Sequence, residues 1–178
     1  MHPHLAEVFT LLDASRDGLR AAVARVPAAA RGQRPAPDRW SVNEILEHLA
    51  LVETRFAANV AAALAQARAT GLGPECDARV PLDDALLVRV VDRAERRTAP
   101  EEMLPTGTLD EAAAWQALDQ AHETFRRTLL GGDGLALGGV VSDHRRFGTL
   151  TAYQWAEVVA GHEWRHVEQI TEMAAERA

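Results

Sequence analysis

Four long stretches of this chain repeat their apolar residues at spacings of three and four, the period of one face of an α-helix. They cover approximately residues 4–26, 41–71, 109–131 and 151 almost to the end of the chain. No stretch has a convincing strand pattern, and the run richest in β-forming residues is Leu86 to Val91. Four amphipathic helices in a chain of 178 residues predict an all-α fold, built as a helical bundle.

The second stretch has the clearest start signal. Ser41 is followed three residues later by Glu44, which is the pattern of a helix capping box, and Trp40 precedes it. The stretch ends at Gly71, and residues 71–108, which lead to the third long helix, are less regular and are interrupted by prolines. Within them, residues 81–97 (PLDDALLVRVVDRAERR) predict either a short helix or an extended crossing segment.

Composition narrows the class of protein. With 47% hydrophobic and 25% charged residues, the chain is expected to form one globular domain over residues 1–178. The net charge of −7 argues against binding to nucleic acid or to anionic membranes, and no window is apolar enough to span a bilayer. The single cysteine, Cys76, lies in a loop and favours a reducing compartment, so a cytoplasmic location is expected.

Residues 162–166 read HEWRH, the H-E-x-x-H string of zinc protease helices. The longer form of that motif needs Gly at position 169 and His at position 172, where this chain has Gln169 and Glu172. No β-sheet is predicted that could form the edge of a substrate cleft. The protease interpretation therefore fails, but His162 and His166 still lie four residues apart on one helical face, where both can bind one ion.

A third histidine lies on another helix. His48 falls between Ile45 and Leu49 on the apolar side of the second stretch, and a histidine buried there needs a polar partner. Together with His162 and His166 it predicts a three-histidine metal site inside the bundle. The alternative is that these are structural histidines, hydrogen-bonded in the core.

Two segments resemble a known family, the DinB/YfiT-like superfamily of metalloenzymes. The segment RWSVNEILEHLALVE is similar to the W-S-x-x-E-x-x-x-H-L segment that opens the second helix in that superfamily. The segment DHRRFGTLTAYQWAEVVAGHEWRHVEQI resembles its H-P-x-F-G-x-L-T…W…H-x-x-x-H-x-x-Q-I block. The chain departs from the pattern at Arg145, where many relatives have Pro, and at Arg165, where many have a further His.

The resemblance implies an up-down-down-up four-helix bundle with a long crossing segment between helices 2 and 3. It implies that His48, His162 and His166 bind one divalent metal, nickel or zinc foremost, with iron or manganese as alternatives, and leave coordination positions open. It further implies a homodimer and a metal-dependent enzyme acting on an unidentified small molecule. The enzyme would be a thiol-dependent S-transferase, using a low-molecular-weight thiol, or a hydrolase. The alternative function is a non-catalytic metal-binding or stress-induced dimeric scaffold.

Three further residues are candidates for a role at this site. Glu44, one turn before His48, is a candidate base, although the capping box alone would explain it. Gln169, one turn beyond His166, is placed to hydrogen-bond a ligand imidazole or a substrate. His144 matches the loop histidine of the family, as a proton shuttle or substrate contact, or as a loop residue hydrogen-bonded to the backbone.

Other polar residues on the predicted helices are expected to have structural roles. Glu163 is turned roughly 100° from His162 around the helix axis and is expected to point toward a neighbouring helix or solvent. His122, near apolar residues of the third long stretch, is expected to be partly buried. His2 and His4 are expected in a loose N-terminal segment.

Overall fold

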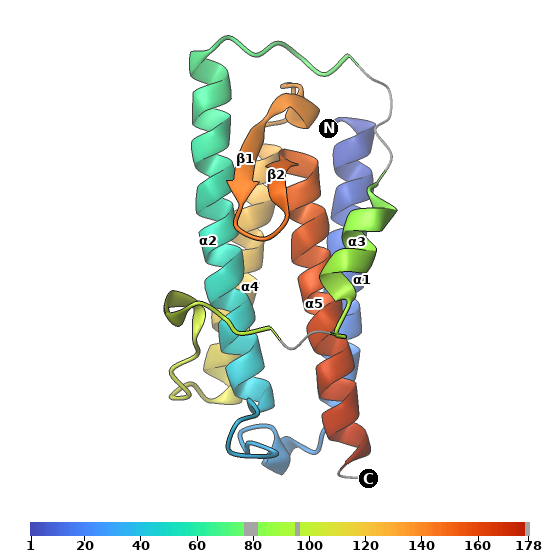
Figure 1. The fold of residues 1–178 in the computed structure, drawn as a ribbon, viewed down its shortest axis with the longest axis vertical. Helices are drawn as coiled ribbons and strands as arrows, with labels where there is room; N and C mark the ends of the chain where they lie inside the picture. Colours follow the sequence, from blue (N-terminus) through green and yellow to red (C-terminus); the bar gives the residue numbers. More distant parts are fainter. Residues whose placement is uncertain (77–81, 95–96, 177–178) are drawn as a thin grey trace.

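Four long helices lie side by side in the computed structural model, which describes residues 1–76, 82–94 and 97–176 (Figure 1). They are α1 (Pro3–Ala24), α2 (Val42–Ala69), α4 (Glu111–Leu130) and α5 (Ala152–Ala175). Helix α1 packs mainly on α5, helix α2 packs mainly on α4, and α2 also contacts α5. The chain is therefore mostly helical, as predicted. None of the helices within the described residues combines the length and the apolarity needed to cross a membrane.

Capping residues explain where the long helices begin. At the start of α2, Ser41 Oγ accepts a hydrogen bond from the Glu44 amide and the Glu44 side chain accepts one from the Ser41 amide, which confirms the predicted capping box. Thr151 and Gln154 form the same reciprocal pair at the start of α5. Both helices that carry the candidate histidines therefore have firmly set first turns.

Of the short elements, one decides an alternative that the sequence left open, and the other was not predicted. The β-rich run is in fact helix α3 (Asp84–Val91), because Asp83 caps its first turn and Leu86 and Val90, four residues apart, face the core. The expectation that strands are absent was wrong. Strands β1 (Val141–His144) and β2 (Gly148–Thr151) form an antiparallel hairpin in which Val141 pairs with Thr151. Four-residue strands are too short for a periodic pattern to identify them.

Three 3₁₀ turns complete the described structure: η1 (Ala28–Ala30), η2 (Glu101–Met103) and η3 (Leu137–Gly139). Of the stretch 81–97, residues 81, 95 and 96 lie outside the described residues, and the rest is α3 followed by non-helical chain. That chain leads to η2, which contacts α2 and brings the carbonyl oxygen of Met103 to the side of His48. The connection between α2 and α4 thus reaches the candidate site.

The N-terminus is packed rather than loose, so the expectation for its histidines was wrong. The His4 side chain is buried against Tyr153 of α5, with ring centroids 3.9 Å apart. His2 caps α1, because its Nδ1 accepts a hydrogen bond from the His4 amide.

The interior is divided into two apolar clusters separated by a layer of buried polar side chains. On α1, for example, Leu12 belongs to one cluster and Leu19 to the other. The side chains between the clusters, here called the polar layer, are Ser15, Arg16, Glu53, His122 and Glu163. On α5, His162 and His166 flank Glu163 of the polar layer, whereas His48 lies five residues before Glu53 on α2, among residues of the second cluster.

The close contact between α3 and α5 depends on a glycine. A Cβ added at Gly161 would lie 2.9–3.0 Å from side-chain atoms of Val90, which is closer than packed carbons tolerate. We expect Gly161→Ala to lower the free energy of unfolding by about 1–3 kcal/mol, measured by urea denaturation. Gly18→Ala is the matched control, because its added Cβ meets nothing closer than 3.8 Å, and it should stabilise by up to about 1 kcal/mol. Equal effects of the two substitutions would contradict this packing.

Candidate metal centre

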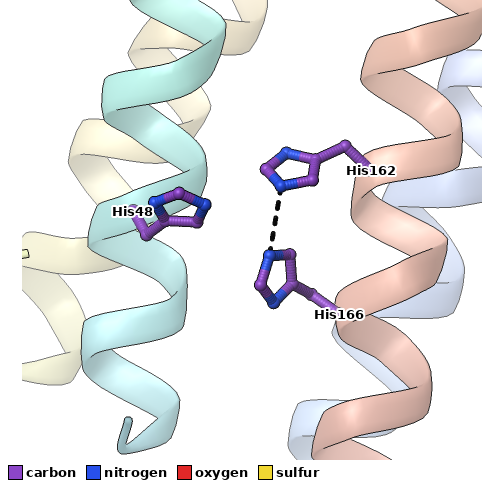
Figure 2. Close-up of side chains that lie close together, drawn as sticks. All are labelled: His48, His162 and His166. Atoms are coloured by element: carbon purple, nitrogen blue, oxygen red, sulfur yellow. Dashed lines mark hydrogen bonds between the residues drawn. The ribbon is translucent and has the colours of Figure 1, made fainter. Parts of the chain in front are cut away.

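Three imidazole rings converge between α2 and α5 (Figure 2). His48 comes from the second turn of α2, while His162 and His166 lie one above the other on α5. The ring centroid of His48 is 5.2 Å from that of His162 and 5.3 Å from that of His166, and the latter two are 4.7 Å apart. One nitrogen from each ring lies within 4.8 Å of the other two. Packing of α2 on α5 therefore brings together residues more than a hundred positions apart in sequence.

Hydrogen bonds fix which nitrogen carries the proton in two of the three rings. The Met103 carbonyl oxygen, 2.7 Å from His48 Nδ1, can only accept, so His48 Nδ1 is protonated and its Nε2 keeps a lone pair. Gln169 Oε1, 3.0 Å from His166 Nδ1, likewise accepts a hydrogen bond, so His166 Nδ1 is protonated and its Nε2 keeps a lone pair. The Nε2 atoms of His162 and His166 face each other at 3.2 Å. The lone pair of His48 Nε2 is thus available for a ligand, while that of His166 Nε2 accepts a hydrogen bond from His162 Nε2, a contact that a bound metal would replace.

The charge state of the rings also suits a metal. Burial lowers the pKa of His48, although its hydrogen bond to the Met103 carbonyl opposes this. Burial and the neighbouring imidazoles hold the pKa values of His162 and His166 well below the ordinary value. All three rings are therefore neutral near pH 7, the form that binds a metal.

The spacing of the donor atoms fits a small divalent ion. Nitrogen ligands at about 2.1 Å from a tetrahedral ion lie roughly 3.4 Å from each other, close to the Nε2 separation of His162 and His166. Three neutral imidazoles are a donor set that zinc, nickel and related ions accept. Among the described residues, no further His, Cys, Asp or Glu ligand atom joins the group. The residues present therefore fit a metal bound by three protein ligands.

An aromatic ring and a backbone carbonyl complete the surroundings. The Trp40 ring lies 4.7 Å from His48 and 6.5 Å from His166, centroid to centroid, and is stacked on the latter. The sequence placed Trp40 only as the residue before the capping box, and it gave no indication of Met103. The position of Trp40 directly before the Ser41 cap, two turns before His48, is the signal that could have placed it beside the site.

Two roles were considered for Glu44, helix cap and catalytic base, and its contacts are those of a helix cap. Its carboxylate accepts from the Ser41 amide at 2.8 Å and from Arg34 Nε at 2.9 Å. Burial opposes ionisation, but the hydrogen bonds from Arg34 and Ser41 lower the pKa of Glu44, so the group is an ionised helix cap. A role as base stays a prediction that these contacts do not support.

His144 lies at the end of β1, with its ring among aromatic side chains. Its Nδ1 accepts hydrogen bonds from the amides of Arg146 and Phe147, at 3.1 and 3.2 Å. Its ring lies 5.5 Å from Phe56 and 5.2 Å from Trp155, and burial lowers its pKa to about 4. His144 is therefore a neutral histidine that stabilises the hairpin turn, and a part in proton transfer stays a prediction.

The polar layer holds a second group of potential ligands: Glu53, His122 and Glu163. A cation is already present there, because Arg16 Nη2 lies 2.8 Å from Glu163 Oε1 and 3.2 Å from Glu53 Oε1. Ser15 donates to Glu163, and His122 Nδ1 lies 3.1 Å from Glu53 Oε2. The arginine supplies the positive charge that a metal would bring, so this group is an ion-pair network. Glu163 points to neighbouring helix α1, one of the two directions expected for it.

These features define a mostly helical protein with a three-histidine group enclosed between two of its long helices. The chain matches the family model described as the DinB superfamily over residues 11–170, and it belongs to that superfamily. The resemblance seen in the sequence is thereby confirmed. Comparison with curated proteins and with solved structures gives no match.

Proposed function

We propose that this protein binds one divalent metal ion through His48, His162 and His166, and that it is a metal-dependent enzyme acting on a small molecule. The observation that carries this proposal is the convergence of three neutral imidazoles from two helices, with two of them oriented by hydrogen bonds to Met103 and Gln169. A divalent ion bound there would supply Lewis acidity, which lowers the pKa of a coordinated water or thiol.

The number of protein ligands supports a catalytic metal site over a structural one. A structural metal site is closed by four protein ligands, whereas a catalytic site keeps a position for water or substrate. The described residues contribute three ligands to this group. We therefore favour an enzyme of the thiol-dependent S-transferase or hydrolase type, with nickel or zinc as first candidates and iron or manganese as alternatives.

Several broader features belong to the same proposal. The parallel pairing of α1 with α5 and of α2 with α4 suits the four-helix bundle expected of this superfamily, as one domain over residues 1–178 (Figure 1). A cytoplasmic homodimer is the form in which we expect the protein to act.

The proposal is tested by elemental analysis of protein purified without chelators and without a histidine tag. About one equivalent of nickel, zinc, iron or manganese is expected in the unaltered protein, and none in a His48→Ala, His162→Ala double variant. His144→Ala is the control, since this histidine bonds to backbone amides and should leave the metal in place. Circular dichroism shows whether each variant is folded.

Two results would overturn parts of the proposal. An unaltered protein that contains no metal and takes up none from several divalent ions would show that the three histidines are structural. A protein that holds its metal but binds neither water, hydroxide nor a thiol as a further ligand of that metal would instead be the non-catalytic scaffold.

A further inference from the structure

The chain that leads from η2 to α4 passes beside the first turns of α2, where His48 lies (Figure 1). Its Met103 carbonyl oxygen accepts the hydrogen bond that orients the His48 ring, at 2.7 Å. Most residues of this connection are exposed, and Leu104, directly after Met103, is 44% exposed. Burial of apolar side chains therefore gives the connection little support, and polar contacts must help to hold the carbonyl beside His48.

Glu47, the residue directly before His48 in α2, holds the chain just after Met103. Its Oε1 accepts hydrogen bonds from the amide and the hydroxyl of Thr106, at 2.9 and 2.7 Å, and its Oε2 accepts one from the Gly107 amide, at 3.1 Å. Hydrogen bonds to a carboxylate are roughly twice as strong as those between neutral groups. Glu47 is only 7% exposed, so water competes little for its oxygens. We call these three hydrogen bonds the Glu47 clamp.

The chain between Met103 and the Glu47 clamp is short and stiff. Only two residues separate Met103 from Thr106, and the second of them, Pro105, has a ring that fixes its φ angle. A residue before proline is largely confined to extended conformations, and Leu104 follows this rule, with φ −75° and ψ 133°. A displacement of Thr106 is therefore passed on to the Met103 carbonyl, because the residues between them have little freedom to absorb it.

The backbone of Gly107 suits the clamp. Its φ of +72° is a left-handed conformation that glycine adopts without strain. A Cβ added at this position would lie 3.1 Å from Glu44 Oε1, so the absence of a side chain also lets the connection lie close to α2. Beyond it, the hydroxyl of Thr108 lies 2.7 Å from that of Thr106 and closes the turn.

We infer that Glu47 is a positioning residue of the metal centre: it holds the connection so that the Met103 carbonyl keeps His48 Nδ1 protonated and leaves His48 Nε2 for the metal. This inference rests on the proposed function, because it assumes that His48 binds a metal. Glu47 is not a member of the three-histidine group, so it acts on the metal only through Met103 and His48.

The first measurement detects the tautomer of His48 in metal-free protein, by ¹⁵N NMR of the histidine side chains, with a His48→Gln spectrum to assign the signal. The unaltered protein should carry the proton on Nδ1. Glu47→Met keeps much of the side-chain volume but removes both acceptor atoms, so the tautomer protonated on Nε2 should become populated. Glu47→Gln retains an acceptor for Thr106 and should restore most of the unaltered spectrum.

The second measurement is the affinity for zinc, by competition with a chromogenic chelator. Loss of a direct partner of a ligand histidine weakens metal binding about 10–100-fold, and Glu47 acts one step further away, so Glu47→Met should weaken it about threefold to tenfold. Glu47→Gln should recover most of this loss. Val60→Ala is the control, because it removes buried volume from the same helix about three turns beyond His48 and should leave the affinity within about twofold.

A second variant keeps the test decisive if Glu47→Met does not fold, which circular dichroism shows. Thr106→Pro removes two of the three donors of the Glu47 clamp at an exposed position and leaves α2 unaltered. It should produce the same change of tautomer at His48 and weaken zinc binding about threefold or more.

The outcomes separate this inference from the proposed function. Unaltered protein that takes up no divalent metal overturns both. If the unaltered protein binds zinc, three results overturn the role of Glu47 and leave the metal centre standing: an unchanged His48 tautomer in Glu47→Met, a changed tautomer without a loss of affinity, or an equal loss of affinity in Val60→Ala. A changed tautomer together with weaker binding, both reversed in Glu47→Gln, supports the role of Glu47.

Discussion

Replacing Arg16 by Met is expected to lower the free energy of unfolding by about 3–5 kcal/mol, because it leaves a buried charge network without its cation. Arg16 is 7% exposed, and the two carboxylates that it pairs with, Glu53 and Glu163, are 1% and 0% exposed. Methionine fills much of the same volume but supplies no charge and no hydrogen bond. Equilibrium urea unfolding of both proteins measures the difference.

The loss of stability caused by Arg16→Met should be smaller at low pH than at high pH. Burial raises the pKa values of Glu53 and Glu163 to about 7, and Arg16 works against this increase. Without Arg16 both pKa values rise further above the ordinary value near 4.5. A carboxyl with a raised pKa in the folded state stabilises the fold at pH below its unfolded pKa, and loses that contribution as pH rises through its folded pKa. Arg16→Met should therefore cost less stability at about pH 5 than at about pH 8.

A neighbouring arginine gives the matched control. Arg20, one turn along α1, pairs with Asp119 at 2.8 Å but is half exposed, so Arg20→Met should change stability by less than about 1 kcal/mol. Adding Glu53→Gln and Glu163→Gln to Arg16→Met removes the unpaired charges and should recover much of the loss. If Arg16→Met and Arg20→Met behave alike at both pH values, the polar layer does not hold the charges that we assign to it.

The sequence predicted the long helices because their signals are local. Apolar spacing marks each of the four, and the Ser41–Glu44 capping box sets the start of α2 to the residue. Helix α3 and the hairpin were predicted ambiguously or not at all, because eight-residue and four-residue elements carry too few turns or alternations to show a period. Their structure depends on packing against α5, which only the folded chain provides.

The candidate ligands were also predictable from local spacing, and so was the contact of Gln169 with a ligand imidazole, whereas the contact of His48 was not. His162 and His166 lie one turn apart, and His48 occupies an apolar-face position, so three residues could be chosen without knowledge of the fold. The contact of His48 with the Met103 carbonyl could not be predicted, because a backbone oxygen has no residue signature. It depends on where the connection between α2 and α4 passes.

The polar layer did leave a signal in the sequence that was not used. Arg16 lies four residues after Leu12 and three before Leu19, both of which are buried, so it occupies a core-facing position of α1. Glu163 stands in the same relation to Val159 in α5. Charged residues at core-facing positions of separate helices indicate that the helices pair them, although the sequence does not show which charges meet.

Replacing Gln169 by Leu is expected to weaken metal binding about 10–100-fold while leaving all three ligands in place. Gln169 Oε1 accepts a hydrogen bond from His166 Nδ1 at 3.0 Å, which fixes the ring so that its other nitrogen faces His162. Leucine cannot accept this hydrogen bond, so the ring loses its orientation and part of its basicity. Competition with a chromogenic chelator measures the affinity for zinc or nickel.

Two further variants show whether the loss of affinity comes from the lost hydrogen bond to His166 or from placing a leucine on this part of α5. Gln169→Glu keeps an acceptor and should bind metal at least as tightly as the unaltered protein, because a carboxylate strengthens the hydrogen bond to the imidazole. Glu168→Leu places the same leucine at the adjacent exposed position and should leave the affinity within about twofold. An unchanged affinity in Gln169→Leu would mean that packing of α5 against α2, and not Gln169, holds the His166 ring in place.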